Sequence, residues 1–271
     1  MTAAVVLSIA GSDPSGGAGI QADLKSFQDA GAYGMAVVTA LTVQNTQGVQ
    51  RWMPVPADFV RDQIRAVVDD MQPAAVKIGM VGAASTAQAI HDALVGYRGT
   101  VVLDPVMVAT SGDVLLDPDA EAALRTLLVP MATLLTPNLP ETRRLVGDQD
   151  VGEWAMAHQI NVLRKDGHGD GSVVQDRLFF LGGGSRVWRH PRITTRNTHG
   201  TGCTLSSAIA ARLARGQDLE SAVSGGIVYL GELLARSAGS TLGKGAHGPL
   251  LHGPVGEGAL ARAAGGGTVR S

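Results

Sequence analysis

The chain has 271 residues, of which 45% are hydrophobic and 17% are charged, and its formal net charge is −2. This composition excludes a disordered chain and argues against a surface that binds nucleic acid. The single cysteine, Cys203, excludes an internal disulfide framework and a zinc site with two cysteine ligands. The apolar start has no Lys or Arg before Lys25, and no apolar run reaches the roughly 18 residues that span a bilayer. We therefore expect a cytoplasmic protein that binds neither a membrane nor nucleic acid.

Short apolar runs alternate with segments of helical period through most of the chain. In the helix expected after Pro54-Val55-Pro56, for example, Val60, Ile64 and Val67 fall on one face. Such alternation predicts an α/β fold, with a mostly parallel central sheet and helices on both of its faces. The predicted strands are 3–9, 35–43, 75–78, 101–103 and 134–135, and the predicted helices are 17–30, the segment after 54–56, one that Asp117 caps and Pro118 begins, 201–215 and 219–236.

Between residues 147 and 192 this alternation stops. Residues 173–180 and 186–188, separated by a glycine-rich turn, predict an antiparallel hairpin. From residue 253 onward the chain is mainly Gly and Ala, which is typical of a flexible tail. We expect residues 1–252 to form a single domain, followed by a tail at 253–271.

A glycine-rich turn at residues 11–19 joins the first predicted strand to the first predicted helix. Glycines there let backbone N–H groups approach a ligand at a helix N-terminus. Gly17-Ala18-Gly19 begins a string like that of dinucleotide-binding folds, but it starts well beyond the strand end, and no acidic residue ends a second strand. By itself this turn fits a ligand site and a tight structural turn equally well.

A second turn, at residues 197–204, carries a sharper signal. Gly200, Thr201, Gly202 and Cys203 open a helix, so that consecutive N–H groups form a site for an anion. A Walker A motif is absent; the nearest string, at residues 239–244, has the wrong spacing. The sequence therefore predicts a phosphate cradle at residues 200–203.

Cys203 lies where the field of that helix is expected to lower its pKa. One interpretation makes it a nucleophile with His199 as base, hence a thiol hydrolase. A second makes it a base or hydrogen-bond partner beside a phosphoryl acceptor, and a third makes it an inert buried residue. Its position directly after Gly-Thr-Gly favours the phosphate cradle.

Taken together, these turns resemble the hydroxymethylpyrimidine/phosphomethylpyrimidine kinases of thiamine biosynthesis, in the ribokinase-like superfamily. The resemblance runs from about residue 7 to 249 and is densest at residues 8–25. It recurs in strings such as Lys77-Ile78-Gly79-Met80, Thr136-Pro137-Asn138-Leu139-Pro140-Glu141 and residues 197–205. It implies a three-layer α/β/α sandwich, and an enzyme that uses ATP and Mg²⁺ to phosphorylate the hydroxymethylpyrimidine and then its monophosphate. The family is commonly homodimeric.

The resemblance also implies roles for individual residues. Gln44 is expected to read the aminopyrimidine edge, because its amide offers an adjacent donor and acceptor. The other residues implied at the pyrimidine are Gly11, Asp23, Met80 and Val106. The implied catalytic residues are Gly200, Thr201, Gly202 and Cys203; the ATP-binding residues are Asn138, Lys165 and Lys244; and the metal ligands are Asp104 and Glu141.

This chain departs from the family pattern on the nucleotide side. Asp166 stands where a glycine is usual, the stretch 141–165 is short, and residues 243–249 contain one residue more than the common spacing. We therefore expect weakened ATP binding with pyrimidine recognition preserved. The alternatives are a pyridoxal or pyridoxine kinase of the same superfamily, the thiol hydrolase, and a pyrimidine-binding protein with impaired ATP handling.

Overall fold

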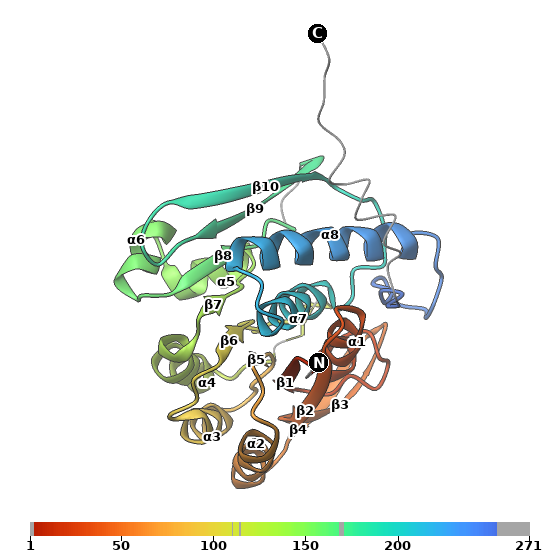
Figure 1. Cartoon of the computed structure of the whole chain (residues 1–271). Helices are drawn as coiled ribbons and strands as arrows, with labels where there is room; N and C mark the ends of the chain where they lie inside the picture. Colours follow the sequence, from red (N-terminus) through yellow and green to blue (C-terminus); the bar gives the residue numbers. More distant parts are fainter. Residues whose placement is uncertain (1–2, 110, 114, 168–170, 254–271) are drawn as a thin grey trace.

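The computed structural model describes residues 3–109, 111–113, 115–167 and 171–253 of the chain. Figure 1 shows strands through the middle of the molecule with helices around them. The strands of the described residues are β1 (Val5–Ala10), β2 (Tyr33–Val38), β3 (Ala40–Asn45), β4 (Gly48–Pro54), β5 (Ala75–Ile78), β6 (Thr100–Leu103), β7 (Leu134–Leu135), β8 (Asn161–Arg164), β9 (Val173–Phe179) and β10 (Ser185–Pro191).

The central sheet has eight strands in the order β10-β9-β8-β7-β6-β5-β1-β2, and β3 pairs with β4 in a separate two-stranded sheet. From β2 to β8 every neighbouring pair is parallel, whereas β8–β9 and β9–β10 are antiparallel. All four residues of β5 are buried, as expected for a sheet that is covered on both faces. The predicted α/β fold with a mostly parallel sheet is confirmed.

The helices follow the strands in regular alternation over most of the chain. Asp117 and Pro118 begin α4 as predicted, although the Asp117 side chain makes no capping hydrogen bond. The helices are α1 (Gly19–Asp29), α2 (Ala57–Met71), α3 (Ala84–Leu94), α4 (Pro118–Ala123) with the short turns η1 (Leu124–Leu128) and η2 (Val129–Met131), α5 (Leu139–Val146), α6 (Val151–Ala157), α7 (Thr201–Ala214) and α8 (Leu219–Ser237).

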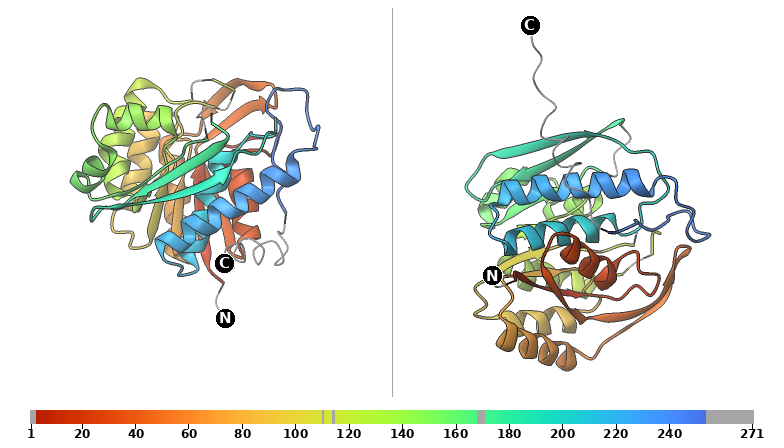
Figure 2. Two further views of the ribbon diagram at one scale, coloured as in Figure 1. Left: turned by 90° about the horizontal axis from the view of Figure 1, so that it is seen from above. Right: turned by 45° about the vertical axis from the view of Figure 1, so that its right-hand side comes forward.

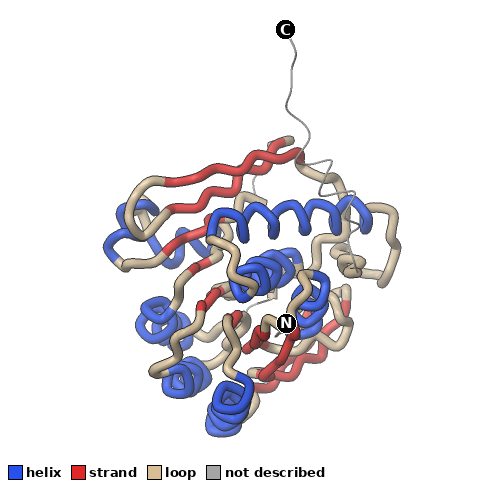
Figure 3. Tube along the Cα trace, in the orientation of Figure 1, coloured by secondary structure: helices blue, strands red, loops and turns tan. Residues whose placement is uncertain are grey.

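These helices form a layer on each face of the sheet (Figure 3). Neighbouring strand residues point to opposite faces, and the cores follow this rule. Val6 belongs to the core shared with α1, α7 and α8, whereas the next residue, Leu7, belongs to the core shared with α2 to α6. The three-layer sandwich is therefore built by the alternation of apolar side chains along short buried strands.

The predicted strand at 35–43 is wrong, because the chain changes direction within it. β2 ends in the central sheet, and β3 begins two residues later in the two-stranded sheet. Thr39 forms the bend: its hydroxyl donates to the carbonyl of Met80 at 2.6 Å, and its N–H donates to the carbonyl of Ala10 at 2.9 Å. Since apolar residues continue on both sides of Thr39, the hydrophobic pattern cannot reveal this change of direction.

The predicted hairpin is confirmed as β9 and β10, at the edge of the central sheet. It runs beside α8 in all views (Figures 1 and 2), where the indole Nε1 of Trp188 donates to the hydroxyl of Ser224 at 2.7 Å. α6 and β8 precede the hairpin and were not predicted. β8 extends the parallel part of the sheet. The alternation of strands and helices therefore continues further along the chain than the sequence pattern predicts.

Within the described part of the chain, no helix has the length and apolar character needed to cross a membrane. Strands from residues 3–109 and 115–167 form one sheet with the hairpin, and α7 and α8 pack on a face of that sheet. The single domain expected over residues 1–252 stays a prediction. The predicted tail lies outside the described residues, apart from Gly253.

Candidate active site

A cavity of about 680 Å³ lies at the carboxyl ends of the parallel strands. Gly11 follows β1, Met80 follows β5, Asp104 follows β6, Asn138 follows β7 and Lys165 follows β8, and all five line this cavity. In open α/β sheets, ligands bind at this edge. Much of the predicted site is thus brought together by the sheet itself.

The start of α7 forms one wall of the cavity, and residues 200–203 all line it. Gly200 has a φ of +82°, and a Cβ atom there would lie 1.8 Å from the carbonyl oxygen of Gly17. The two glycine-rich turns therefore touch, and only glycine fits at their contact. No side chain of the described residues caps α7; the Thr201 N–H donates to the Thr198 carbonyl at 3.4 Å, and the other amides of the first turn are left to face the cavity. This arrangement is suited to an anion.

Lys165 and Asp104 form an ion pair beside these amides. The Lys165 Nζ lies 2.8 Å from Asp104 Oδ1, and the side chain of Asp104 is only 2% exposed. The Thr136 hydroxyl donates to the same carboxylate at 3.0 Å. Burial alone would raise the pKa of Asp104, but the Lys165 and Lys77 ammonium groups outweigh burial and hold that pKa below its usual range. Asp104 is therefore an ionised carboxylate within the cavity.

Asn138 and Glu141 form a capping box at the start of α5. The Asn138 side chain accepts from the Glu141 N–H at 2.9 Å, and Glu141 Oε2 accepts from the Asn138 N–H at 2.8 Å. Burial raises the pKa of Glu141 to about 7, although Lys165 opposes this shift. These two residues therefore cap α5, and both also line the cavity.

The oxygen atoms of Asp104, Asn138 and Glu141 are ligands of the kind that Mg²⁺ prefers. In the described residues, no group of three or more His, Cys, Asp or Glu side chains is arranged to hold a metal ion unaided. A magnesium ion is typically held by one or two carboxylates and completes its shell with phosphate and water. The residues present therefore fit a magnesium ion that arrives with a polyphosphate.

The opposite end of the cavity is more apolar. Met80 packs with Ala40 and Leu115 in a small cluster that Val106 also joins. Gln44 reaches this end from β3, and its Nε2 lies 3.4 Å from the Nε2 of His199. Of the five residues expected at the pyrimidine, Gly11, Gln44, Met80 and Val106 line the cavity.

Two predicted site residues do not line the cavity. Asp23 is fully buried behind the cavity wall, where it pairs with Lys77. It lies in the middle of α1, and its side chain turns toward the sheet rather than toward the turn at 11–19. Lys244 is exposed and lies outside the lining. This arrangement therefore does not bring Asp23 or Lys244 to the cavity.

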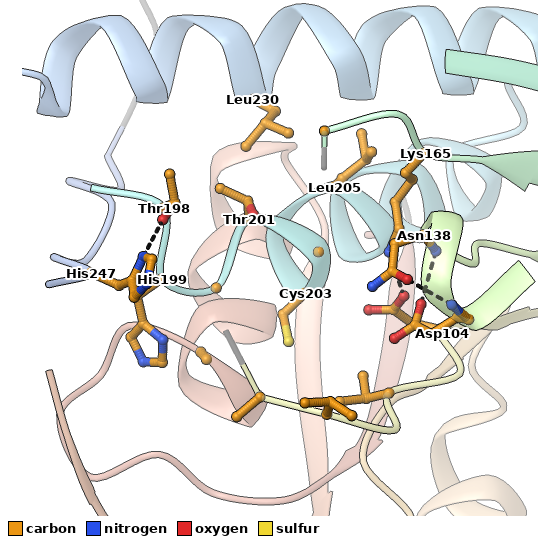
Figure 4. Close-up of a pocket in the computed structure, with 18 of the residues that line it drawn as sticks. Asp104, Asn138, Lys165, Thr198, His199, Thr201, Cys203, Leu205, Leu230 and His247 are labelled. Atoms are coloured by element: carbon orange, nitrogen blue, oxygen red, sulfur yellow. Dashed lines mark hydrogen bonds and ion pairs between the residues drawn. The ribbon is translucent and has the colours of Figure 1, made fainter. Parts of the chain in front are cut away.

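Cys203 lies at the start of α7 between two groups of side chains (Figure 4). Asp104, Asn138 and Lys165 are on one side of it, and His199 is on the other. The expectation that its pKa is lowered is wrong: burial raises the pKa of the thiol to about 11, although Lys77 opposes the shift. A protonated thiol is a poor nucleophile.

His199 is not placed as a base for that thiol. Its Nε2 lies 2.7 Å from Asp13 Oδ2, and no hydrogen bond between His199 and Cys203 is found in the described residues. The same carboxylate of Asp13 accepts the N–H groups of Gly17 and Ala18. The Asp13–His199 pair therefore ties the two glycine-rich turns together, and the arrangement does not support a thiol hydrolase.

Other lining residues were not singled out from the sequence. One feature of the sequence could have indicated Asp13, since it is the only acidic residue in the turn at 11–19. His247, from the segment with one extra residue, lines the cavity, and its Nδ1 lies 2.9 Å from the Thr198 hydroxyl. Asp176 and His190 of the hairpin also line it, 3.3 Å apart. Only the tertiary structure brings these segments to the cavity.

Asp166, the unusual residue after Lys165, turns away from the cavity. Its Oδ2 accepts from the Gln175 N–H at 3.4 Å, and its own N–H donates to Asp176 at 2.9 Å. It is not part of the lining. Its carboxylate thus attaches the loop after β8 to the hairpin. Because this carboxylate does not face the cavity, Asp166 gives no reason to expect weaker phosphate binding.

Comparison with known proteins matches this architecture. Residues 13–251 match a family model described as phosphomethylpyrimidine kinase. The chain is 49% identical over 261 residues to the hydroxymethylpyrimidine/phosphomethylpyrimidine kinase of Rhizobium meliloti (strain 1021), covering 92% of this chain and 97% of that protein. It is 44% identical over 257 residues to the Escherichia coli (strain K12) protein of the same name, covering 91% and 96%.

Two solved structures show the same fold. The phosphomethylpyrimidine kinase of Clostridium difficile 630 has a TM-score of 0.74 and 40% identity, covering 84% of this chain and 98% of that one. The Staphylococcus aureus pyridoxal kinase in complex with ADP has a TM-score of 0.81 and 29% identity, covering 93% and 94%. The fold is therefore ribokinase-like, and the match to the family model extends over nearly the whole chain. This chain belongs to the phosphomethylpyrimidine kinase family.

Proposed function

We propose that this protein is an ATP-dependent kinase of thiamine biosynthesis, which phosphorylates 4-amino-5-hydroxymethyl-2-methylpyrimidine and then its monophosphate. One observation carries the proposal: a single cavity is lined both by Gln44 with its apolar neighbours and by residues 200–203 at the start of α7, which no side chain of the described residues caps. A small ring with a hydroxymethyl group fits the first part, and a triphosphate tail fits the second.

Recognition of the acceptor depends on Gln44 and its apolar neighbours. The Gln44 amide can donate to a ring nitrogen and accept from the adjacent exocyclic amine. Met80 and Val106 pack against the faces of the ring, since they belong to the same small cluster. The ring is thereby oriented so that its hydroxymethyl group points toward Cys203.

Phosphoryl transfer depends mainly on positioning and on neutralisation of charge. The amides of residues 200–203 hold phosphate oxygens, and Lys165, 2.8 Å from Asp104, supplies an ammonium group beside them. The Cys203 thiol is protonated at neutral pH, which makes it a hydrogen-bond partner of the reacting oxygens rather than a covalent catalyst. Asp104, Asn138 and Glu141 would hold Mg²⁺, which would neutralise phosphate charge when bound.

A pyridoxal kinase is the nearest alternative, because pyridoxal is also a ring with a hydroxymethyl group. The pyrimidine is favoured by the higher identity to relatives that carry that name, 49% against 29% for the pyridoxal kinase. Turnover of the two substrates, measured side by side, distinguishes them. A clear preference for pyridoxal would overturn the choice of substrate but not the kinase reaction.

We further propose a homodimer that forms through the two-stranded sheet. Leu41 and Met53 lie opposite each other on β3 and β4 and are 49% and 60% exposed, and Val43 is 42% exposed on the same face of β3. Burial of this apolar face would stabilise a second copy. Sedimentation of a single monomeric species at micromolar concentration would contradict this proposal. We place the enzyme in the cytoplasm, where ATP is available.

We retain the proposal that ATP binding is weakened while pyrimidine recognition is preserved, now because of the segment 243–249. Lys244 is exposed and outside the cavity lining, whereas His247 lines the cavity in its place. Calorimetric titration with ADP and with the pyrimidine measures both affinities. An ordinary low Michaelis constant for ATP in a coupled kinase assay would contradict the expectation.

The decisive experiment is incubation with the hydroxymethylpyrimidine, Mg²⁺ and ATP, followed by mass analysis of the products. We expect the monophosphate and then the diphosphate. Binding of the pyrimidine without any product would instead support a binding protein that has lost its kinase activity.

A further inference from the structure

A buried ion pair behind the phosphate cradle takes no part in the reaction described above. Lys77 of β5 and Asp23 of α1 are both fully buried, and the Lys77 Nζ lies 2.9 Å from each oxygen of the Asp23 carboxylate. The carboxylate also accepts from the hydroxyl groups of Ser8, at 2.6 Å, and Ser207, at 2.7 Å. Asp23 is thus held by groups from β1, β5 and α7.

The pair is connected to the cradle through α7. Ser207 follows Cys203 by about one helical turn, so that both side chains lie on the same face of the helix. On the sheet side, a Cβ atom at Gly79 would lie 2.7 Å from the Lys77 Nζ, and the next residue, Met80, lines the cavity. The ammonium group therefore lies immediately behind the cavity wall.

The charges of the pair do not cancel at the cavity. The Lys77 ammonium lowers the pKa of the Cys203 thiol more than the Asp23 carboxylate raises it, although burial raises that pKa most of all. Both members of the pair therefore act on the thiol, and of the two the ammonium acts more strongly.

Stability alone does not account for such a pair. Removal of two charges from water costs several kcal/mol per ion, and apolar residues of similar volume are often equally stabilising. We propose that Lys77, held in place by Asp23, is a positioning residue that supplies a fixed positive charge behind Cys203 and the amides of α7. Asp23 thereby acts on the site from behind the wall and does not touch the substrate.

A fixed charge of this kind is useful for the proposed phosphoryl transfer, on which this inference rests. Negative charge on the transferred group and on the sulfur is stabilised most by groups that need no reorganisation during the reaction. The four hydrogen bonds that Asp23 accepts prevent the pair from reorienting.

The test uses Cys203 as the reporter, because it is the only cysteine of the chain. The rate of alkylation by iodoacetamide is measured by intact mass, without substrates, as a function of pH. The variant is Lys77→Met combined with Asp23→Asn, which removes both charges and leaves no carboxylate unpaired. A rise of one unit in the thiol pKa reduces the thiolate tenfold but increases its nucleophilicity, so that alkylation at fixed pH slows about threefold or more.

The matched control is Ser8→Ala, which removes one hydrogen bond to Asp23 and leaves both charges. Its alkylation rate is expected to stay within about twofold of the unmodified protein. If the pair had a merely structural role, both variants would have a looser site, and alkylation of Cys203 in the double variant would become faster. An unchanged or faster rate in the folded double variant would overturn the proposal. If the double variant does not fold, Lys77→Gln combined with Asp23→Asn, which also leaves no charge unpaired, is measured in the same way, with the same two outcomes.

Kinase assays on the same variants separate this inference from the proposed function. We expect kcat to fall at least tenfold in the double variant while the KM for the pyrimidine stays within about twofold, because the ring pocket is untouched. If the unmodified protein has no kinase activity, the proposed function fails, and the alkylation result still decides whether Lys77 acts on Cys203.

Discussion

Replacement of Gly200 by alanine tests the contact between the two glycine-rich turns. The substitution lowers the free energy of unfolding in two ways. The first is the backbone conformation, since a φ of +82° costs an L residue about 1–2 kcal/mol. The second is overlap, because the Cβ atom would lie 1.8 Å from the carbonyl oxygen of Gly17, and overpacking of this kind costs about 1–3 kcal/mol more. We therefore expect Gly200→Ala to destabilise the fold by about 2–5 kcal/mol.

Gly216→Ala is the matched control. Its φ is +81°, but it is exposed at the end of α7 and a Cβ atom there would meet nothing within 4 Å. Only the backbone cost applies to it. The difference in unfolding free energy between the two variants, measured by urea denaturation, therefore isolates the contact with Gly17. Equal destabilisation of the two variants would refute the argument that the turns are packed against each other.

The same substitution is expected to affect catalysis. To accept the Cβ atom, the turn at 11–19 must move away from α7, which displaces the amides of the cradle from the acceptor pocket. A misplacement of about 1 Å costs on the order of 100-fold in rate. Gly216→Ala should retain its kcat, because it lies at the opposite end of the helix.

Three further predictions concern the two ends of the cavity. Lys165→Met should destabilise the fold by about 3–5 kcal/mol, because Asp104, 2% exposed, loses its counter-ion; unchanged urea denaturation would contradict this. Gln44→Ala should raise the KM for the pyrimidine about 10- to 100-fold through the loss of two hydrogen bonds, with the KM for ATP unchanged; an equal change in both constants would argue against its assigned role. The hydrogen bond to Asp176 raises the pKa of His190, so its stabilisation is complete below about pH 6 and is lost as the pH rises through that raised pKa. The difference in unfolding free energy between the unmodified protein and His190→Gln should therefore be larger at about pH 5.5 than at about pH 8.5, and a constant difference would count against the pair.

Local features of the chain were predictable because they depend on neighbours in the sequence. The hairpin of β9 and β10 follows from two apolar runs around a glycine turn. The capping box of Asn138 and Glu141 needs only residues three apart at a helix start. The bend at Thr39 was missed for the opposite reason, since Thr39 is held by hydrogen bonds to the carbonyls of Ala10, in β1, and Met80, just after β5.

By itself, the sequence determined the α/β layering and the two glycine-rich turns, because strand period, helix period and turn chemistry are short-range properties. The residues expected at the pyrimidine came from the resemblance to the kinase family and not from these patterns. Only the tertiary structure decided that Asp23 faces Lys77 rather than the cavity, and that Lys165 pairs with Asp104. It also decided that the pKa of Cys203 is raised rather than lowered. These outcomes depend on burial and on distances between charges far apart in the chain, which no local pattern encodes.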